Sequence, residues 1–219
     1  MGKLKTQAAK DSLLRRVRKQ RLNNITILPS LVTILNGVCG FASIVFASEG
    51  SFEIAGYMLL LAMLADMMDG RLARMSQSTS SFGGQLDSLC DIISFGIAPA
   101  FLMLKMLQVR FNLHEAPSIA FNDFAERFIW LVAATYVSCA AIRLARFNVE
   151  NEEDESAHMS FIGLPTPAAA GVVVSLVIFR EHSLSVQDPE SIMYFISQDV
   201  IIYILPFMLL TVAVLMVSR

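Results

Sequence analysis

Hydrophobic and charged positions alternate in long blocks along this chain. Six stretches contain no Asp, Glu, Lys or Arg, namely residues 25–48, 54–65, 92–104, 128–142, 160–179 and 200–218. A helix that crosses the hydrocarbon core of a bilayer needs about 20 mainly apolar residues. The second, third and fourth stretches reach that length only if charged neighbours belong to the same helices. We therefore expect an all-α integral membrane protein with six transmembrane helices, at about 28–48, 52–75, 84–107, 126–148, 164–181 and 199–218. Pro165 and Pro167 are expected to bend the fifth of them.

The composition favours the same class of protein. Hydrophobic residues make up 55% of the chain and charged residues 16%, against about 25% charged in soluble domains. This disfavours a soluble globule, a disordered chain and a secreted disulfide scaffold. The three cysteines lie far apart in apolar stretches and are expected to be small buried hydrophobic residues; they are Cys39, Cys90 and Cys139. We expect a basic segment over 1–24 and one membrane domain over 25–219.

The distribution of basic residues predicts the orientation of the helices. Eight of the 17 Lys and Arg residues precede residue 25, and the connections on that side bring the number to 13, against four on the other side. Cytoplasmic loops carry the excess of Lys and Arg, so both termini are expected in the cytoplasm and the protein in the cell membrane, crossing it several times. Residues 12–22 fit either a basic amphipathic juxtamembrane helix on the anionic leaflet or a flexible basic tail.

Candidate chemistry is concentrated in four aspartates. Asp66 and Asp69 are three residues apart, and Asp87 and Asp91 are four apart, so each pair shares one face of a helix. The connection at 75–82 is short, which makes the two helices antiparallel neighbours. The four carboxylates are therefore expected to point toward one place. The alternative is that they lie, solvated and without function, in a polar inner loop.

Buried carboxylates at this density call for a cation. Each costs roughly 2.5–3.5 kcal/mol in the middle of a membrane, and only Arg71 and Arg74 lie near them in the sequence. Oxygen ligands without His or Cys favour a hard ion, Mg²⁺ or Mn²⁺. Four carboxylates suit two such ions about 3.5–4 Å apart, the arrangement that supports phosphoryl displacement. Three small residues in the same stretch would allow a ligand or a neighbouring helix to approach closely; they are Gly70, Ala73 and Gly83.

The spacing of these residues resembles the signature of the CDP-alcohol phosphotransferases, with all eight positions present: Asp66, Asp69, Gly70, Ala73, Arg74, Gly83, Asp87 and Asp91. The resemblance implies a six-helix membrane enzyme, usually a homodimer, whose active site opens to the cytoplasm and whose divalent metals hold a CDP-linked substrate. Residues 28–40, 86–100, 143–148 and 161–170 resemble the membrane-type phosphatidylserine synthases of that family. This implies transfer of a phosphatidyl group from CDP-diacylglycerol to L-serine by direct in-line attack, with release of CMP.

The resemblance also implies roles for single residues. Asp66, Asp69 and Asp87 would be metal ligands, and Asp91 would be both a ligand and the general base toward the incoming hydroxyl. The expected contacts to the CDP-linked lipid come from Thr33, Asp66, Gly70, Ala73, Arg74, Gly83 and Asp87.

An amino-acid acceptor requires a cation that the aspartates do not supply. Arg143, Arg146 and Asn148 follow the fourth apolar stretch, on the side predicted to hold the carboxylates. Arginine binds a carboxylate bidentately, so these residues are candidates for binding serine. The alternative is that the arginines only snorkel to the membrane surface and set topology. Asn36 is a weaker candidate, for which a hydrogen bond between helices is the alternative.

Three other functions stay open. A relative with a different acceptor, glycerol 3-phosphate or inositol, would share the aspartate signature. A transporter of metal ions or small solutes also places carboxylates inside the membrane. A structural membrane protein could use the Asp and Arg side chains only to pack helices.

Overall fold

The computed structural model describes residues 30–76, 81–111, 124–153, 163–186 and 192–218. Within these ranges the regular structure is helical and contains no strand. The helices are Ser30–Ser48, α2 (Phe52–Ser76), α3 (Ser81–Asp91), the π-helix η1 (Ile92–Ile97), α4 (Ala98–Arg110), α5 (Phe124–Glu153), α6 (Thr166–Val186), α7 (Ile192–Phe195), the π-helix η2 (Ile196–Val200) and α8 (Ile201–Val217). The expected segment at 12–22 lies outside the described residues.

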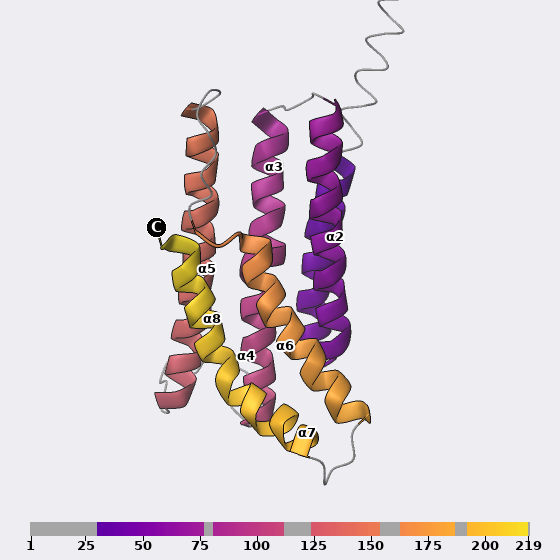
Figure 1. Cartoon of the computed structure of the whole chain (residues 1–219), viewed down its shortest axis with the longest axis vertical. Helices are drawn as coiled ribbons and strands as arrows, with labels where there is room; N and C mark the ends of the chain where they lie inside the picture. Colours follow the sequence, from indigo (N-terminus) through magenta and orange to yellow (C-terminus); the bar gives the residue numbers. More distant parts are fainter. Residues whose placement is uncertain (1–29, 77–80, 112–123, 154–162, 187–191, 219) are drawn as a thin grey trace, which may run out of the picture.

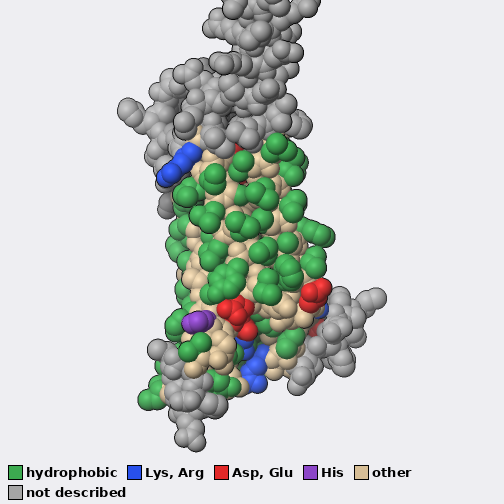
Figure 2. Space-filling model, turned by 90° about the vertical axis from the view of Figure 1, so that its right-hand side faces the viewer, with side chains coloured by type: hydrophobic (Ala, Val, Ile, Leu, Met, Phe, Trp, Pro, Cys, Tyr) green, Lys and Arg blue, Asp and Glu red, His purple; other side chains and the backbone are tan. Residues whose placement is uncertain are grey.

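Five of the described helices are long and apolar enough to cross a membrane: Ser30–Ser48, Gly83–Arg110, Phe124–Val149, Thr166–Val186 and Gln198–Val217. They confirm the all-α membrane class, with bounds close to those expected. The second expected span, at 52–75, is helical from Phe52 to Ser76 but carries Glu53, Asp66 and Asp69. On the face shown in Figure 2, hydrophobic side chains cover the middle and charged ones lie toward the ends. The chain is thus a multi-pass helical membrane protein.

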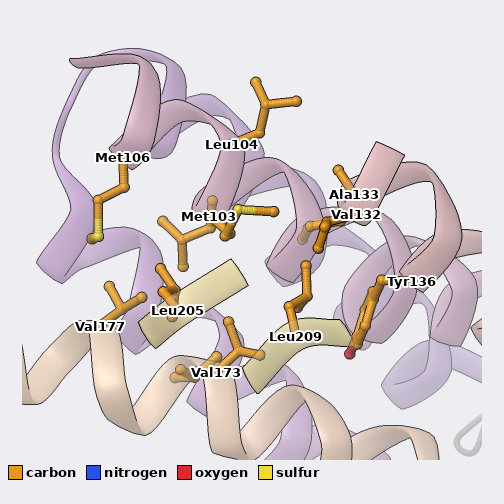
Figure 3. Packing of buried hydrophobic residues seen from close by; sticks show 14 of the residues in the cluster. Met103, Leu104, Met106, Val132, Ala133, Tyr136, Val173, Val177, Leu205 and Leu209 are labelled. Atoms are coloured by element: carbon orange, nitrogen blue, oxygen red, sulfur yellow. The ribbon is translucent and has the colours of Figure 1, made fainter. Parts of the chain in front are cut away.

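The helices pack around α4. This helix contacts α2, α5, α6 and α8, while α8 packs along α5 and α6, and α2 packs along α6 (Figure 1). Hydrophobic side chains from four helices fill the core at this place (Figure 3); those labelled there are Met103, Leu104, Met106, Val132, Ala133, Tyr136, Val173, Val177, Leu205 and Leu209. Two of the cysteines, Cys39 and Cys90, are buried and Cys139 is partly buried, all as free thiols.

The prediction that Pro165 and Pro167 bend the fifth span was wrong. The helix α6 begins at Thr166, so Pro165 precedes it and Pro167 is its second residue. Proline lacks a backbone N–H and has a helix-compatible φ, which suits the first turn, where N–H groups have no partner inside the helix. In α8, by contrast, Pro206 lies inside the helix.

The helix Ser30–Ser48 packs closely against η1 because glycine lines the contact. A Cβ atom built on Gly40 would lie 2.6 Å from Ser94 Cα, and one on Gly37 would lie 3.0 Å from Cys90 Sγ. The Ser94 hydroxyl donates a hydrogen bond of 2.9 Å to the backbone oxygen of Asn36 across this contact. Small residues allow helix backbones in a membrane to approach in this way.

Replacing Gly40 with Ala should destabilise the protein, because the added methyl group has no space beside Ser94. Overpacking of this kind typically costs about 1–3 kcal/mol. The matched control is Gly171→Ala in α6, where a Cβ atom meets its nearest neighbour, Met63 Cε, at 3.8 Å. Thermal melting of the purified proteins in detergent measures the difference. A Gly40→Ala protein as stable as Gly171→Ala would contradict the close packing.

Candidate active site

Three of the four predicted aspartates form one cluster. Asp66 lies near the C-terminal end of α2, and Asp87 and Asp91 lie on α3, which runs in the opposite direction (Figure 1). One carboxylate oxygen from each of the three residues lies within 4.8 Å of the others. Asp91 is buried, whereas Asp66 and Asp87 are partly buried. The described residues thus contain a group of carboxylates that could hold a metal ion.

Asp69 lies one turn from Asp66 on α2 and is engaged differently. Its side chain is buried and its carboxylate accepts a hydrogen bond from the Thr33 hydroxyl of the first described helix. The structure thus brings together Thr33 and Asp69, both expected at the site. That Asp69 is itself a metal ligand stays a prediction.

Asn36 forms a hydrogen bond between helices, the alternative role that the sequence offered for it, and its partner is Asp91. The Asn36 side chain is fully buried, and its Nδ2 atom donates a hydrogen bond of 2.9 Å to Asp91 Oδ1. An amide N–H satisfies one carboxylate oxygen and leaves the other available to a metal or a substrate. A signal was present, because Thr33, Asn36, Gly37 and Gly40 follow helical spacing and form one polar, small-residue stripe.

A π-helix begins directly after Asp91. In η1 the backbone turn is wider than in an α-helix, and such segments frequently occur at functional sites. The hydroxyl group of Tyr136, a fully buried residue of α5, donates a hydrogen bond of 2.9 Å to the Phe95 backbone oxygen. This contact and the one from Ser94 to Asn36 attach the π-turn to two neighbouring helices. Asp91 is therefore placed at the start of a well-fixed segment.

The glycines of the signature lie beside the carboxylates. A Cβ atom added to Gly70 would meet no other atom within 4 Å, and the same holds for Gly84, which follows Gly83. Close packing of helices therefore does not explain why Gly70 lacks a side chain. The open space where a Gly70 side chain would lie, next to Asp69, is suited to a ligand that lies flat against the helix. The side chains of Ala73 and Arg74, in the last turns of α2, lie outside the described part.

Arg143, predicted to bind serine, lies on α5, which contacts the aspartate helix α3. Its guanidinium group is close enough to Asp91 for their opposite charges to interact. Its Nη1 atom donates a hydrogen bond of 3.0 Å to Thr166 Oγ1, at the start of α6. Arg146, one turn further along α5, is partly buried.

Asn148, also predicted to bind serine, contacts the aspartate helix instead. Its Nδ2 atom donates a hydrogen bond of 2.9 Å to Ser88 Oγ. Ser88 follows Asp87 directly, and its hydroxyl also lies 3.1 Å from the backbone oxygen of Gly84. In this arrangement Asn148 attaches α5 to α3 beside the cluster, and its predicted contact with serine stays a prediction.

The electrostatics of the site suit a divalent cation. Three carboxylates whose oxygens lie within 4.8 Å of one another repel each other when ionised. All the donors of this group are oxygen atoms, which favours hard ions such as Mg²⁺ and Mn²⁺. The donor set therefore fits the metal expected from the sequence.

The chain matches the profile of the CDP-alcohol phosphatidyltransferase family over residues 26–217. The match covers the apolar stretches and the whole aspartate cluster, and the protein belongs to this family. The recognition made from the eight-residue signature is thereby confirmed.

Several curated relatives carry more specific names. The CDP-diacylglycerol–serine O-phosphatidyltransferase of Helicobacter pylori is 35% identical over 157 residues, which are 72% of this chain and 60% of that protein. The protein of the same name from Mycobacterium tuberculosis is 30% identical over 166 residues, 74% of this chain and 53% of the relative. The archaetidylserine synthase of Methanothermobacter thermautotrophicus is 35% identical over 167 residues, which are 75% of this chain and 63% of that protein. The chain thus spans between about half and two thirds of the length of these relatives.

Proposed function

We propose that this protein transfers a phosphatidyl group from CDP-diacylglycerol to the hydroxyl group of L-serine and releases CMP. The observation that carries the proposal is the cluster of Asp66, Asp87 and Asp91, with Arg143 on α5, a helix that contacts the aspartate helix α3. Carboxylates that can hold metal suit a diphosphate substrate, and a nearby arginine suits an acceptor with a carboxylate. The names of the relatives, a CDP-diacylglycerol–serine O-phosphatidyltransferase and an archaetidylserine synthase, support the same acceptor.

The metal ligands in this proposal are Asp66, Asp69, Asp87 and Asp91, and the cofactor is two divalent cations, Mg²⁺ or Mn²⁺. When bound, such ions would stabilise the negative charge that develops on the phosphate oxygens and on the departing CMP. The fit rests on the all-oxygen donor set and on the short separation of three carboxylates. Asp69, through its hydrogen bond from Thr33, would also connect the metal ligands to the first described helix.

Asp91 is the general base in this mechanism. It takes the proton of the serine hydroxyl while the serine oxygen forms a bond to the phosphorus that carries the diacylglycerol. The bond between that phosphorus and the oxygen of the CMP phosphate breaks, and CMP leaves with the electron pair. The Asn36 amide donates to one oxygen of Asp91 and so keeps the other oriented as the proton acceptor. Because the serine oxygen attacks the phosphorus directly, this mechanism has no covalent enzyme intermediate.

The CDP part of the substrate is expected along α2 and α3. Gly70 and Gly83 would allow it to lie against the backbone, and the open space at the Gly70 Cα supports this. Ala73 and Arg74 would lie further along the same surface of α2, with Arg74 near the substrate phosphates. Thr33, already within hydrogen-bond distance of Asp69, would contact the nucleotide from the first described helix.

The active site is proposed to face the cytoplasm, in the cell membrane, with both termini on that side. The support is the excess of Lys and Arg on the side of the chain that holds the aspartates. A homodimer is the assembly implied by the resemblance to the family.

Other acceptors are the main alternative. Glycerol 3-phosphate carries a doubly charged phosphate and would need a denser basic pocket than Arg143 and Arg146 provide. Inositol carries no charge and would need none. Incubation of the purified protein with CDP-diacylglycerol, Mn²⁺ and each alcohol in turn separates these possibilities by CMP release. We expect release with L-serine and little with glycerol 3-phosphate or inositol. Transport of Mn²⁺ into vesicles without CMP release would favour a transporter.

Replacing Arg143 with Ala should raise the KM for L-serine about tenfold or more, with a smaller change in the KM for CDP-diacylglycerol. The reason is the loss of a charge-assisted bond to the serine carboxylate, which contributes roughly 1.5–3 kcal/mol. The same experiment on Arg146→Ala tests the second candidate. Arg110→Ala is the matched control, since its ion pair with Asp199 lies at the C-terminal end of α4, away from the cluster. Equal shifts in both KM values would assign Arg143 to the phosphate or to topology.

A further inference from the structure

Thr166 contacts Arg143 from a rigid position. It is the first residue of α6, its side chain is fully buried, and its hydroxyl oxygen accepts the hydrogen bond of 3.0 Å from Arg143 Nη1. Prolines stand on both sides, at 165 and 167, and each fixes its own φ. Burial and the two neighbouring prolines restrict the position of Thr166, so its hydroxyl gives the guanidinium group a defined partner.

The start of α6 is itself attached to the end of α8. The backbone N–H of Leu164 donates a hydrogen bond of 3.0 Å to the Leu215 oxygen. Gly163 has a φ of +84°, and a Cβ atom on it would lie 2.6 Å from the Met216 oxygen, so only glycine fits there without strain. This attachment fixes where the backbone enters α6 and hence where Thr166 lies.

The guanidinium group of Arg143 has one nitrogen atom bound by Thr166 and one buried nitrogen atom without a partner in the described part of the chain. Nη1 is bound to Thr166, while Nε is buried and has no hydrogen-bond partner among the described residues. The edge formed by Nε and Nη2 is one that binds a carboxylate with two parallel hydrogen bonds. A buried donor without a partner is costly, and a carboxylate ligand on this edge would remove that cost.

Asp91 lies on α3 and Arg143 on α5, two helices in contact, so one ligand could use both groups. The salt bridges among the described residues do not include a pair of Arg143 with Asp91. A small molecule that carries a carboxylate and a hydroxyl a few bonds apart could place the first on the arginine and the second beside the aspartate. An amino acid with a hydroxyl side chain has this chemistry.

We propose that Thr166 is a positioning residue that determines acceptor specificity: by holding Nη1 of Arg143, it turns the Nε–Nη2 edge toward the carboxylate of the hydroxy-amino-acid acceptor. This inference rests on the proposed function, since it assumes that serine binds at Arg143. Thr166 does not touch the substrate and acts only through the arginine. Its hydroxyl therefore matters for an acceptor that carries a carboxylate and not for one that lacks it.

The test compares Thr166→Val, which keeps the shape and loses the hydrogen-bond acceptor, with Thr166→Ser, which keeps the hydroxyl. The acceptors are L-serine and serinol, in which a hydroxymethyl group replaces the carboxylate; serinol is measured as a substrate or as a competitive inhibitor. We expect Thr166→Val to weaken apparent L-serine binding about tenfold, with serinol and CDP-diacylglycerol changed less than twofold. Thr166→Ser should behave like the unmodified protein.

The ratio of the two acceptors protects the test against partial unfolding. A smaller folded fraction lowers the rate with any substrate but leaves the ratio of L-serine to serinol affinity unchanged within one preparation. A loss that is equal for both acceptors, or an unchanged preference for L-serine, would overturn the role of Thr166.

Combination with Arg143→Ala separates the inference from the proposed function. In the Arg143→Ala background, Thr166→Val should cause no further change in the KM for L-serine, because its effect passes through the arginine. If Arg143→Ala weakens L-serine binding and Thr166→Val does not, only the role of Thr166 is refuted. If Arg143→Ala leaves L-serine binding unchanged, the serine site itself is refuted and the inference with it.

Discussion

Replacing Asp66 or Asp87 with Asn should remove bound divalent metal and lower turnover by more than about 100-fold. The two side chains belong to different helices, and their oxygen atoms lie within 4.8 Å of each other and of Asp91. Loss of a residue that only supports a metal ligand typically costs 10–100-fold in affinity or activity, so loss of a ligand should cost more. Mn²⁺ bound per protein, measured by electron paramagnetic resonance, and CMP release report the two effects separately.

The matched control is Asp199→Asn. Asp199 is an acidic residue of η2 that pairs with Arg110, so its substitution changes the charge equally without touching the cluster. It should keep both metal and activity. Full turnover in Asp66→Asn or Asp87→Asn would remove the basis for a metal site at this place.

Asp91→Asn should leave CDP-diacylglycerol binding near normal and lower kcat by about 10²–10⁴-fold, the usual contribution of a general base. The substituted side chain keeps its shape and a carbonyl oxygen that can still accept the Asn36 hydrogen bond. The other carboxylates can still hold metal in part. The new amide cannot accept the proton of the serine hydroxyl, and a more basic solution should not restore activity because the basic group is absent.

Two measurements on the same purified variant decide this assignment: the affinity for the CDP-linked lipid and kcat. Variants at Asp66 provide the comparison, since a plain ligand should lose metal, lipid binding and turnover together. The same joint loss in Asp91→Asn would make Asp91 a plain ligand. A kcat within a few-fold of the unmodified protein would show that the hydroxyl needs no base there.

The helices could be predicted well from the sequence because each one corresponds to a local stretch of mainly apolar residues. The charge-free stretches and the aspartates that extend them gave helical spans close to those observed, including the expected span of 84–107 inside the continuous helical segment Gly83–Arg110. The aspartates Asp66, Asp87 and Asp91 could be grouped for the same reason: helical spacing places two on one face, and a short connection brings the third beside them. Two helices joined by so short a connection have few ways to pack other than as antiparallel neighbours.

Contacts between helices far apart in the sequence could not be predicted in the same way. Asn36 lies 55 residues before Asp91, and Thr166 lies 23 residues after Arg143; nothing in local periodicity links either pair. The bend expected at Pro165 and Pro167 was wrong because proline can either break a helix or begin one. Here α6 begins at Thr166, beside Leu164, which is hydrogen-bonded to α8. The π-turn after Asp91 likewise forms hydrogen bonds with two helices that are distant in the sequence: Ser94 donates to Asn36, and Phe95 accepts from Tyr136.

The central claim is that a divalent metal at the aspartate cluster supports transfer of the phosphatidyl group to L-serine. The most direct test measures phosphatidylserine and CMP together, by mass spectrometry, from one sample of purified protein with CDP-diacylglycerol and L-serine. The prediction is that the two products form in equal amounts, that a chelator stops both, and that Mg²⁺ or Mn²⁺ restores both. Formation of CMP without phosphatidylserine, or undiminished synthesis in the presence of chelator, would contradict it.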